Sequence, residues 1–239
     1  MPSKAAATTD TSATSASQRI YAYLRRCILE LEMPPGTRVV ELDIAAAHGV
    51  SRTPVHEAVR RLAEEGLIEI VQRVGTFVSR IPVDELEEAM LVRTALEVAI
   101  VEKATQHVDS GGLALLNGLL ARQRACMTEG NHQGFHEADE AFHAALADIA
   151  GCPGVWRTIL QAKTQIDRFR RLTLPIAGRM AGVIEEHAAV VDALAQRQPE
   201  SAKDAMRNHL DHVLPVIGAT RAFRPDYFVN KSAPSPGTP

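Results

Sequence analysis

Residues 41–78 constrain the fold more than any other part of this 239-residue chain. Apolar residues recur at helical spacing before Gly49, which can adopt the positive φ that ends a helix and turns the chain sharply. Ser51 or Thr53 can cap a following helix, and Pro54 is tolerated in its first turn because the N–H it lacks would have no partner there. The pattern predicts two short helices joined by a tight turn.

The second helix and the segment after it complete the pattern. From Val55, apolar residues repeat at i, i+4 and i+7, so they face inward. After Gly66, strand-like runs at 67–71 and 76–79 flank a Gln-Arg-Val-Gly turn. Helix, turn, helix and hairpin in this order predict a winged helix-turn-helix over residues 18–81, with the hairpin as its wing.

The polar residues of this pattern are candidates for contact with double-stranded DNA. If the apolar stripe of the second helix faces inward, Arg52, His56, Arg60 and Arg61 point outward in varying degree. Arg73 lies near the tip of the hairpin. The alternative is an ordinary solvated helix face, which arginines often form.

Three short motifs resemble the GntR family of bacterial transcription regulators. They are Pro34-Pro35-Gly36-Thr37, Ser51-Arg52-Thr53-Pro54-Val55 and Glu65-Gly66-Leu67-Ile68. The resemblance implies that the operator is contacted by Arg52, Thr53 and the turn from Arg73 to Gly75. The chain departs from the family pattern at His56, where a second arginine is usual and where the charge is only partial near neutral pH.

The charge of the N-terminal part is nearly balanced. The whole chain carries a formal charge of −3, and residues 18–80 contain nine Lys or Arg against eight Asp or Glu. Such a weakly basic domain is expected to bind DNA as a homodimer that supplies two copies, with an affinity that falls as salt rises.

The rest of the chain is predicted to be all helical. Gly and Pro punctuate apolar helical patterns over residues 82–222, which predicts an antiparallel bundle of about six helices as a second domain. Ile81-Pro82-Val83 is the expected joint. Residues 1–17 are expected to be a disordered tail because they are rich in Ala, Ser and Thr, and residues 223–239 are expected to be a C-terminal tail that is disordered from Ser232 onward. The fold class is therefore mainly α.

Four residues of the bundle have the spacing of a metal site. Asp139 and His143 are four apart, so both point to one side of a helix. His187 and His209 lie on apolar stripes of other helices and so face the interior. Three imidazoles and a carboxylate suit Zn²⁺ best, with Ni²⁺, Mn²⁺ or Fe²⁺ as alternatives. The other interpretation is four separate residues, each hydrogen-bonded or at the surface.

A second resemblance bears on this choice. Arg93-Thr-Ala-Leu-Glu97, Asp139-Glu-Ala-Phe-His143, Glu186-His187 and Arg207-Asn-His209 resemble the all-helical effector domain called FCD. Its metal-binding members have ligands at the four matching positions, which implies a divalent metal here. The resemblance also implies a pocket for a small carboxylic acid.

A guanidinium can bind a carboxylate at two points, so arginines of the bundle are the candidates for binding such an acid. Arg93 is the first candidate for the effector-binding guanidinium, and its alternative is an exposed position on a helix. Arg168 belongs to a run with Arg170 and Arg171 that more often forms a solvated face, so it is held in reserve.

These features predict a DNA-binding transcription regulator, as a repressor, whose operator affinity is controlled by a small carboxylic acid at a divalent metal. One alternative is a regulator whose metal is structural or is itself the signal. A remote alternative is a metal-dependent hydrolase, but no further carboxylate is placed as a general base, so the chain is not expected to be an enzyme. No apolar stretch is long enough for a membrane, and three cysteines without metal-type pairing fit a cytoplasmic protein.

Overall fold

The computed structural model describes residues 15–230, and the chain divides into two compact units. One unit comprises the described residues up to Ile28 together with Glu32–Ser79, and the other comprises Leu29–Leu31 and the described residues from Arg80 onward. Of the two expected tails, residues 1–14 and 231–239 lie outside the described part of the chain.

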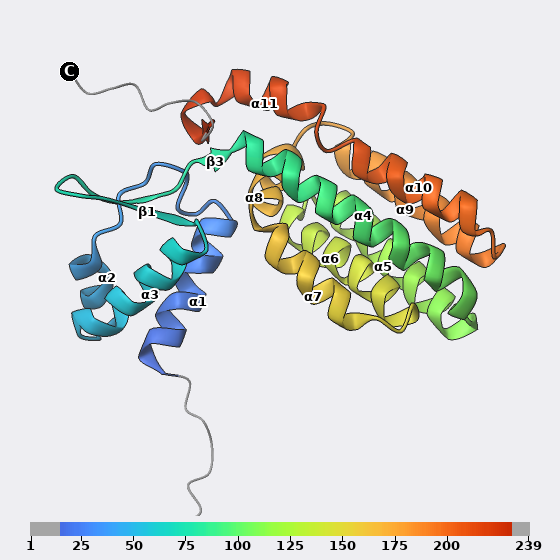
Figure 1. Cartoon of the computed structure of the whole chain (residues 1–239), viewed down its shortest axis with the longest axis horizontal. Helices are drawn as coiled ribbons and strands as arrows, with labels where there is room; N and C mark the ends of the chain where they lie inside the picture. Colours follow the sequence, from blue (N-terminus) through green and yellow to red (C-terminus); the bar gives the residue numbers. More distant parts are fainter. Residues whose placement is uncertain (1–14, 231–239) are drawn as a thin grey trace, which may run out of the picture. The chain divides into compact units, whose positions relative to one another are not determined.

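The N-terminal unit is a winged helix-turn-helix, as predicted (Figure 1). Its elements are α1 (Ala16–Leu29), α2 (Glu41–His48), α3 (Arg52–Glu64), β1 (Ile68–Val71) and β2 (Gly75–Val78). The two strands pair antiparallel, and the core is apolar, with Leu24, Val59 and Leu62 almost fully buried.

Local sequence explains where these elements end. Gly49 adopts a φ of 63° and its N–H bonds to the last carbonyls of α2, so it ends the helix as expected. Ser51 stands at the N-cap of α3, but its side chain makes no capping hydrogen bond to a described residue. In the wing, Arg73 has a φ of 62°, a left-handed conformation that costs a non-glycine residue energy.

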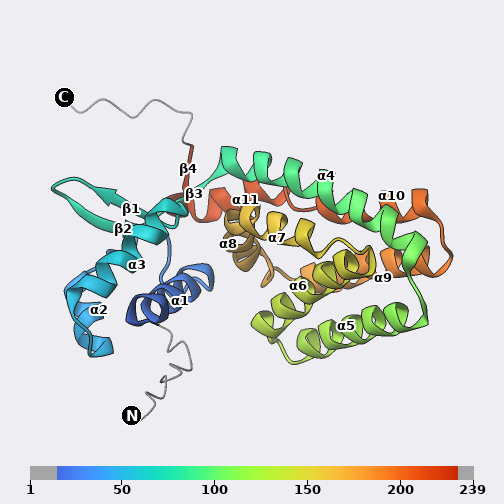
Figure 2. The ribbon, with the colours of Figure 1, turned by 60° about the horizontal axis from the view of Figure 1, so that its bottom comes forward.

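The C-terminal unit is an all-α bundle (Figure 2). Within residues 15–230 its helices are α4 (Val83–His107), α5 (Ser110–Thr128), α6 (His132–Ile149), α7 (Pro153–Ala162), α8 (Thr164–Thr173), α9 (Arg179–Ala195), α10 (Pro199–Asp211) and α11 (Val216–Phe223). α4 packs on α6 and α10, α5 packs on α6 and α9, and α9 packs on α10. These five helices therefore enclose a shared core.

The helix count exceeds the predicted six for an identifiable reason. α7 and α8 are separated only at Lys163, where no Gly or Pro marks a break in the sequence. A further short helix, α11, follows the turn at Pro215. The break at Lys163 has no signal in the sequence, whereas the break before α11 falls at Pro215, a residue that often marks a helix boundary.

The expected C-terminal tail is partly wrong. Residues 225–229 form a 3₁₀ turn, η1 (Pro225–Tyr227), and a short strand, β4 (Phe228–Val229), which pairs in parallel with β3 (Ile81–Pro82). Phe228 is buried, and its ring lies 6.3 Å from that of Phe169. Burial of these aromatic rings orders a segment whose composition resembled a tail.

None of the helices in residues 15–230 is both long enough and apolar enough to cross a membrane.

Candidate metal centre and nucleic-acid interface

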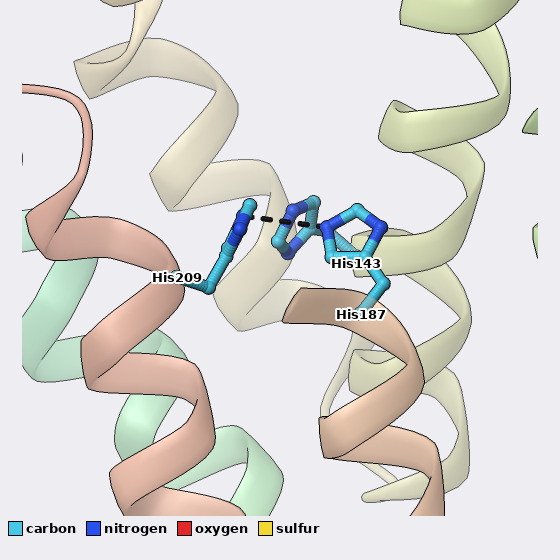
Figure 3. Close-up of side chains that lie close together, drawn as sticks. All are labelled: His143, His187 and His209. Carbon is cyan, nitrogen blue, oxygen red and sulfur yellow. Dashed lines mark hydrogen bonds between the residues drawn. The ribbon is translucent and has the colours of Figure 1, made fainter. Parts of the chain in front are cut away.

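Three histidines from three different helices meet inside the C-terminal unit (Figure 3). His143 lies on α6, His187 on α9 and His209 on α10, and each is at most 1% exposed. One ring nitrogen of each lies within 4.8 Å of the corresponding nitrogens of the other two. His187 Nε2 and His209 Nε2 are 3.3 Å apart.

The carboxylate of Asp139 lies beside this cluster, one helical turn before His143. Its Oδ1 is 3.7 Å from His187 Nε2, and its Oδ2 is 3.9 Å from His143 Nε2. The structure thus brings together the four residues that were predicted as metal ligands. Their donor atoms are the neutral nitrogens and carboxylate oxygen that divalent transition metals bind.

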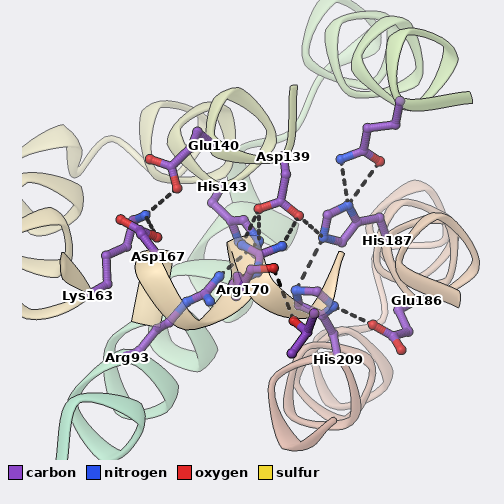
Figure 4. Close-up of polar contacts among 12 residues, drawn as sticks. Arg93, Asp139, Glu140, His143, Lys163, Asp167, Arg170, Glu186, His187 and His209 are labelled. Atoms are coloured by element: carbon purple, nitrogen blue, oxygen red, sulfur yellow. Dashed lines mark hydrogen bonds and ion pairs between the residues drawn. The ribbon is translucent and has the colours of Figure 1, made fainter. Parts of the chain in front are cut away.

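Each histidine also has a polar partner on its other nitrogen (Figure 4). Glu186 Oε2 lies 2.7 Å from His209 Nδ1, and Gln123 lies 3.1–3.2 Å from His187 Nδ1. Glu97 Oε2 is 2.5 Å from His143 Nδ1, although out of line for a hydrogen bond. Each Nδ1 thus faces a polar side chain, in the position of the outer partners that orient metal-bound histidines.

The contact between His187 and His209 constrains their tautomers. Glu186 accepts from His209 Nδ1, which leaves a lone pair on His209 Nε2. Two lone pairs would repel at 3.3 Å, so His187 donates its Nε2–H to His209 in this arrangement. Both amide atoms of Gln123 lie within reach of His187 Nδ1, so Gln123 can serve either tautomer of His187. If the Gln123 amide turned so that its oxygen accepted from His187 Nδ1, the proton of His187 would move to Nδ1 and its Nε2 would carry a lone pair.

Burial fixes the charges at this site. Burial lowers the pKa of His209 to about 4 and that of His187 well below its usual value, so both are neutral near pH 7. Burial alone would raise the pKa of Asp139, but the adjoining Arg170 guanidinium brings it well below its ordinary value. Burial would likewise raise the pKa of Glu97, but the Arg93 guanidinium brings it below its ordinary value. Neutral imidazoles and an ionised carboxylate are the states in which these groups bind metal.

Arg93 lies inside the bundle and not at the surface. It is 1% exposed, its Nε donates to Glu97 Oε1 at 2.5 Å, and its Nη2 lies 3.1 Å from His143 Nε2. The effector candidate therefore contacts one of the predicted metal ligands.

The arginines of α8 do not form the solvated face that such runs usually make. Arg168 is fully buried and donates to Gln165 at 2.9 Å. Arg170, which was not selected from the sequence, is 5% exposed and donates to both oxygens of Asp139, at 2.5 and 2.6 Å. Positions 168 and 170 do not share a face by helical spacing, so only the tertiary neighbours show that both are buried.

A second group with metal-ligand chemistry lies nearby. His136, Glu140 and Asp167 offer ligand atoms within 4.8 Å of one another. However, the ammonium of the buried Lys163 contacts both carboxylates, at 2.5 Å for Asp167. That group already contacts the Lys163 ammonium, so the three-histidine cluster is the better candidate for a metal site.

The predicted DNA-binding residues lie on the surface of the N-terminal unit. Arg52, Thr53, His56 and Arg60 are exposed on α3, and Arg73 is exposed in the turn between β1 and β2. Arg52 and the partly buried Gly75 line the same surface hollow, so α3, the second helix of the helix-turn-helix, and the wing border one face.

One contact on this face was missed by the sequence analysis. The Glu41 carboxylate is only 12% exposed and bridges Arg52 Nε at 2.8 Å and His56 Nδ1 at 2.9 Å. Burial would raise the pKa of Glu41, but the hydrogen bonds from His56 and Arg52 lower it. Glu41 thus holds two candidate base-reading side chains in place.

A winged helix-turn-helix followed by an all-helical domain places this protein in the class of bacterial DNA-binding transcription regulators. The model for bacterial regulatory proteins of the gntR family matches residues 16–78, and the FCD domain model matches residues 88–212. The chain belongs to the GntR family of transcription regulators and carries an FCD domain.

Proteins similar to this chain support the assignment. An HTH-type regulator in an unstable DNA locus of Streptomyces ambofaciens is 35% identical, over 91% of each chain. The HTH-type transcriptional repressor RspR of Escherichia coli K12 is 30% identical, over 89% of this chain and 93% of its own. A solved GntR regulator from Rhodococcus has a TM-score of 0.71 at 25% identity, over 86% of this chain and 99% of its own.

These proteins are transcription regulators and not enzymes, as expected for this chain. The hydrolase alternative therefore has no support.

Proposed function

We propose that this GntR-family protein is a repressor whose operator affinity is controlled by a small carboxylic acid bound at a divalent metal in the C-terminal unit. The observation that supports it best is the arrangement of three buried histidines, each with Nδ1 facing a polar side chain, with Nε2 of His143 and His187 beside the Asp139 carboxylate and Nε2 of His209 beside that of His187. Zn²⁺ fits this donor set best, and Ni²⁺, Mn²⁺ and Fe²⁺ also suit it.

When bound, the metal would supply a Lewis-acidic centre that attracts a carboxylate oxygen. Asp139, His143, His187 and His209 would hold it, and Glu97, Gln123 and Glu186 would orient the imidazoles. Arg93 would bind the acid through its guanidinium, with Arg168 in reserve. Because the site is buried, these charges act in a medium that screens them weakly.

The N-terminal unit would bind operator DNA as part of a homodimer in the cytoplasm. The exposed Arg52, Thr53, His56 and Arg60 of α3 would enter the major groove, while Arg73 and Gly75 of the wing would lie along the backbone. An acid that binds the two states of the dimer unequally would change operator affinity by the ratio of its two affinities.

Replacing Arg52 with alanine is expected to weaken operator binding by about 1–3 kcal/mol, because a guanidinium that reads a base edge is lost. The side chain is 66% exposed, so the thermal midpoint should hardly move. Fluorescence anisotropy with labelled operator measures the first quantity. Arg122→Ala, an exposed arginine on α5, is the matched control, and an unchanged affinity in Arg52→Ala would remove that residue from the interface.

The metal and acid half of the proposal is tested by thermal unfolding of the zinc-loaded protein with a panel of mono-, di- and hydroxycarboxylic acids. A ligand at 100 times its Kd should stabilise the native state by about 2.7 kcal/mol. Stabilisation by one class of acid, lost after chelation, supports the proposal. No response to any acid, with zinc still bound, would favour a structural or sensed metal instead.

A further inference from the structure

Two guanidinium groups contact the atoms that a metal would need. Arg170 donates to both oxygens of Asp139, at 2.5 and 2.6 Å. Arg93 Nη2 lies 3.1 Å from Nε2 of His143, whose other nitrogen faces Glu97. Figure 4 shows both arginines reaching the Asp139 and His143 side of the cluster. In this structure, two buried guanidinium groups therefore contact the Asp139 oxygens and the His143 nitrogen that would bind the metal.

The buried charges around the cluster balance. Arg93 is paired with Glu97 and Arg170 with Asp139, so the charges of each pair cancel. All four charged side chains are at most 6% exposed. A divalent cation would add two positive charges to a group whose net charge is zero. Buried charge without compensation is strongly unfavourable, so two negative charges must enter with the metal or soon after it.

Metal coordination also weakens the present pairs. A divalent cation bound to Asp139 would neutralise the carboxylate charge that now attracts Arg170. It would also repel the Arg170 guanidinium at short range. Coordination by His143 Nε2 likewise uses the lone pair that now accepts from Arg93. Arg170 would then need a new anionic partner inside the bundle, whereas Arg93 would keep Glu97 through its Nε but would lose the acceptor of its Nη2.

We propose that Arg170 and Arg93 are exchangeable counter-charges, which hold Asp139 and His143 in the metal-free protein and are released to a dicarboxylic acid when metal binds. This inference rests on the proposed function and deepens it, because it assigns the effector two negative charges and adds Arg170 to its binding site. Metal and acid then bind with positive coupling, and each raises the affinity of the other by the same factor.

The first test is Arg170→Met, which removes the charge and keeps most of the length of the side chain. The metal-free variant should unfold at a lower temperature, because Asp139 is left as a buried and unpaired carboxylate. Its affinity for Zn²⁺, measured by competition with a chromogenic chelator, should rise about tenfold or more, because metal binding now relieves that cost. The neighbouring and partly exposed Arg171→Met is the control and should match the wild type.

The second test uses the wild-type protein, so it does not depend on how the variant folds. Succinate and malonate should raise the thermal midpoint of the zinc-loaded protein more than acetate does, and should have little effect on the metal-free protein. Equal shifts for acetate and the dicarboxylates, or a zinc affinity in Arg170→Met that is unchanged or lower, would overturn the exchange. If the wild type binds zinc in these experiments, the proposed metal site stands even when the exchange fails; if it binds none, both fail.

Discussion

Asp139→Ala is expected to lower the free energy of unfolding of the metal-free protein by about 3–5 kcal/mol, because it leaves the buried Arg170 guanidinium without its carboxylate. For a protein of this size the thermal midpoint should fall by roughly 10 °C. Differential scanning calorimetry measures both quantities. Asp148→Ala, at an exposed position on the same helix, is the matched control.

The pH dependence of this effect follows from the pKa of Asp139, which lies well below its ordinary value in the folded protein. A carboxyl group with a lowered folded pKa stabilises the native state above its unfolded pKa of about 4 and loses that contribution as the pH falls below it. The wild type and Asp139→Ala should therefore differ fully at pH 7 and converge in strong acid. A loss below 1 kcal/mol at pH 7 would mean that the ion pair is not formed in solution.

His143→Ala is expected to remove specific zinc binding. Loss of an outer partner of a metal-bound histidine typically costs about 10–100-fold in affinity, and loss of a ligand itself should exceed that. Competition with a chromogenic chelator provides the affinity, and equilibrium dialysis provides the stoichiometry. Glu186→Gln alters the outer partner of His209, together with the contacts of Glu186 to Arg179 and His212, and leaves the ligand itself in place, so it should give the smaller loss.

The control for His143→Ala is His132→Ala, an exposed histidine at the start of the same helix. If His143→Ala keeps the zinc affinity of the wild type, the metal lies elsewhere. The group of His136, Glu140 and Asp167 would then be the next place to test, with Lys163 as the competing cation.

The N-terminal fold could be predicted closely because its signals are local. Gly49 adopts the positive φ expected of a helix-ending glycine, and the wing strands begin and end within a residue or two of the predicted runs. The bridge from Glu41 to Arg52 and His56 was not predictable in this way. It joins two helices, and neither helix pattern alone says which polar residues face each other.

In the bundle, helical spacing was enough to turn Asp139 and the three histidines inward, but it could not supply their partners. Glu97 and Glu186 lie in motifs that the sequence analysis quoted, so they could have been selected as outer partners. Gln123 gave no such signal, because a glutamine on a helix is usually solvated. The contact of Arg170 with Asp139 could not be predicted, because burial of α8 depends on helices distant in sequence.

Control of repression by an acid at the metal can be measured as the affinity of the protein for its operator in four conditions: zinc-loaded or chelated, each with and without a dicarboxylic acid. The operator can be selected from random DNA with the protein itself. We predict that the acid weakens operator binding by about 5–150-fold in the zinc-loaded protein and has no effect after chelation. Operator affinity that follows zinc alone and ignores every acid would contradict the account.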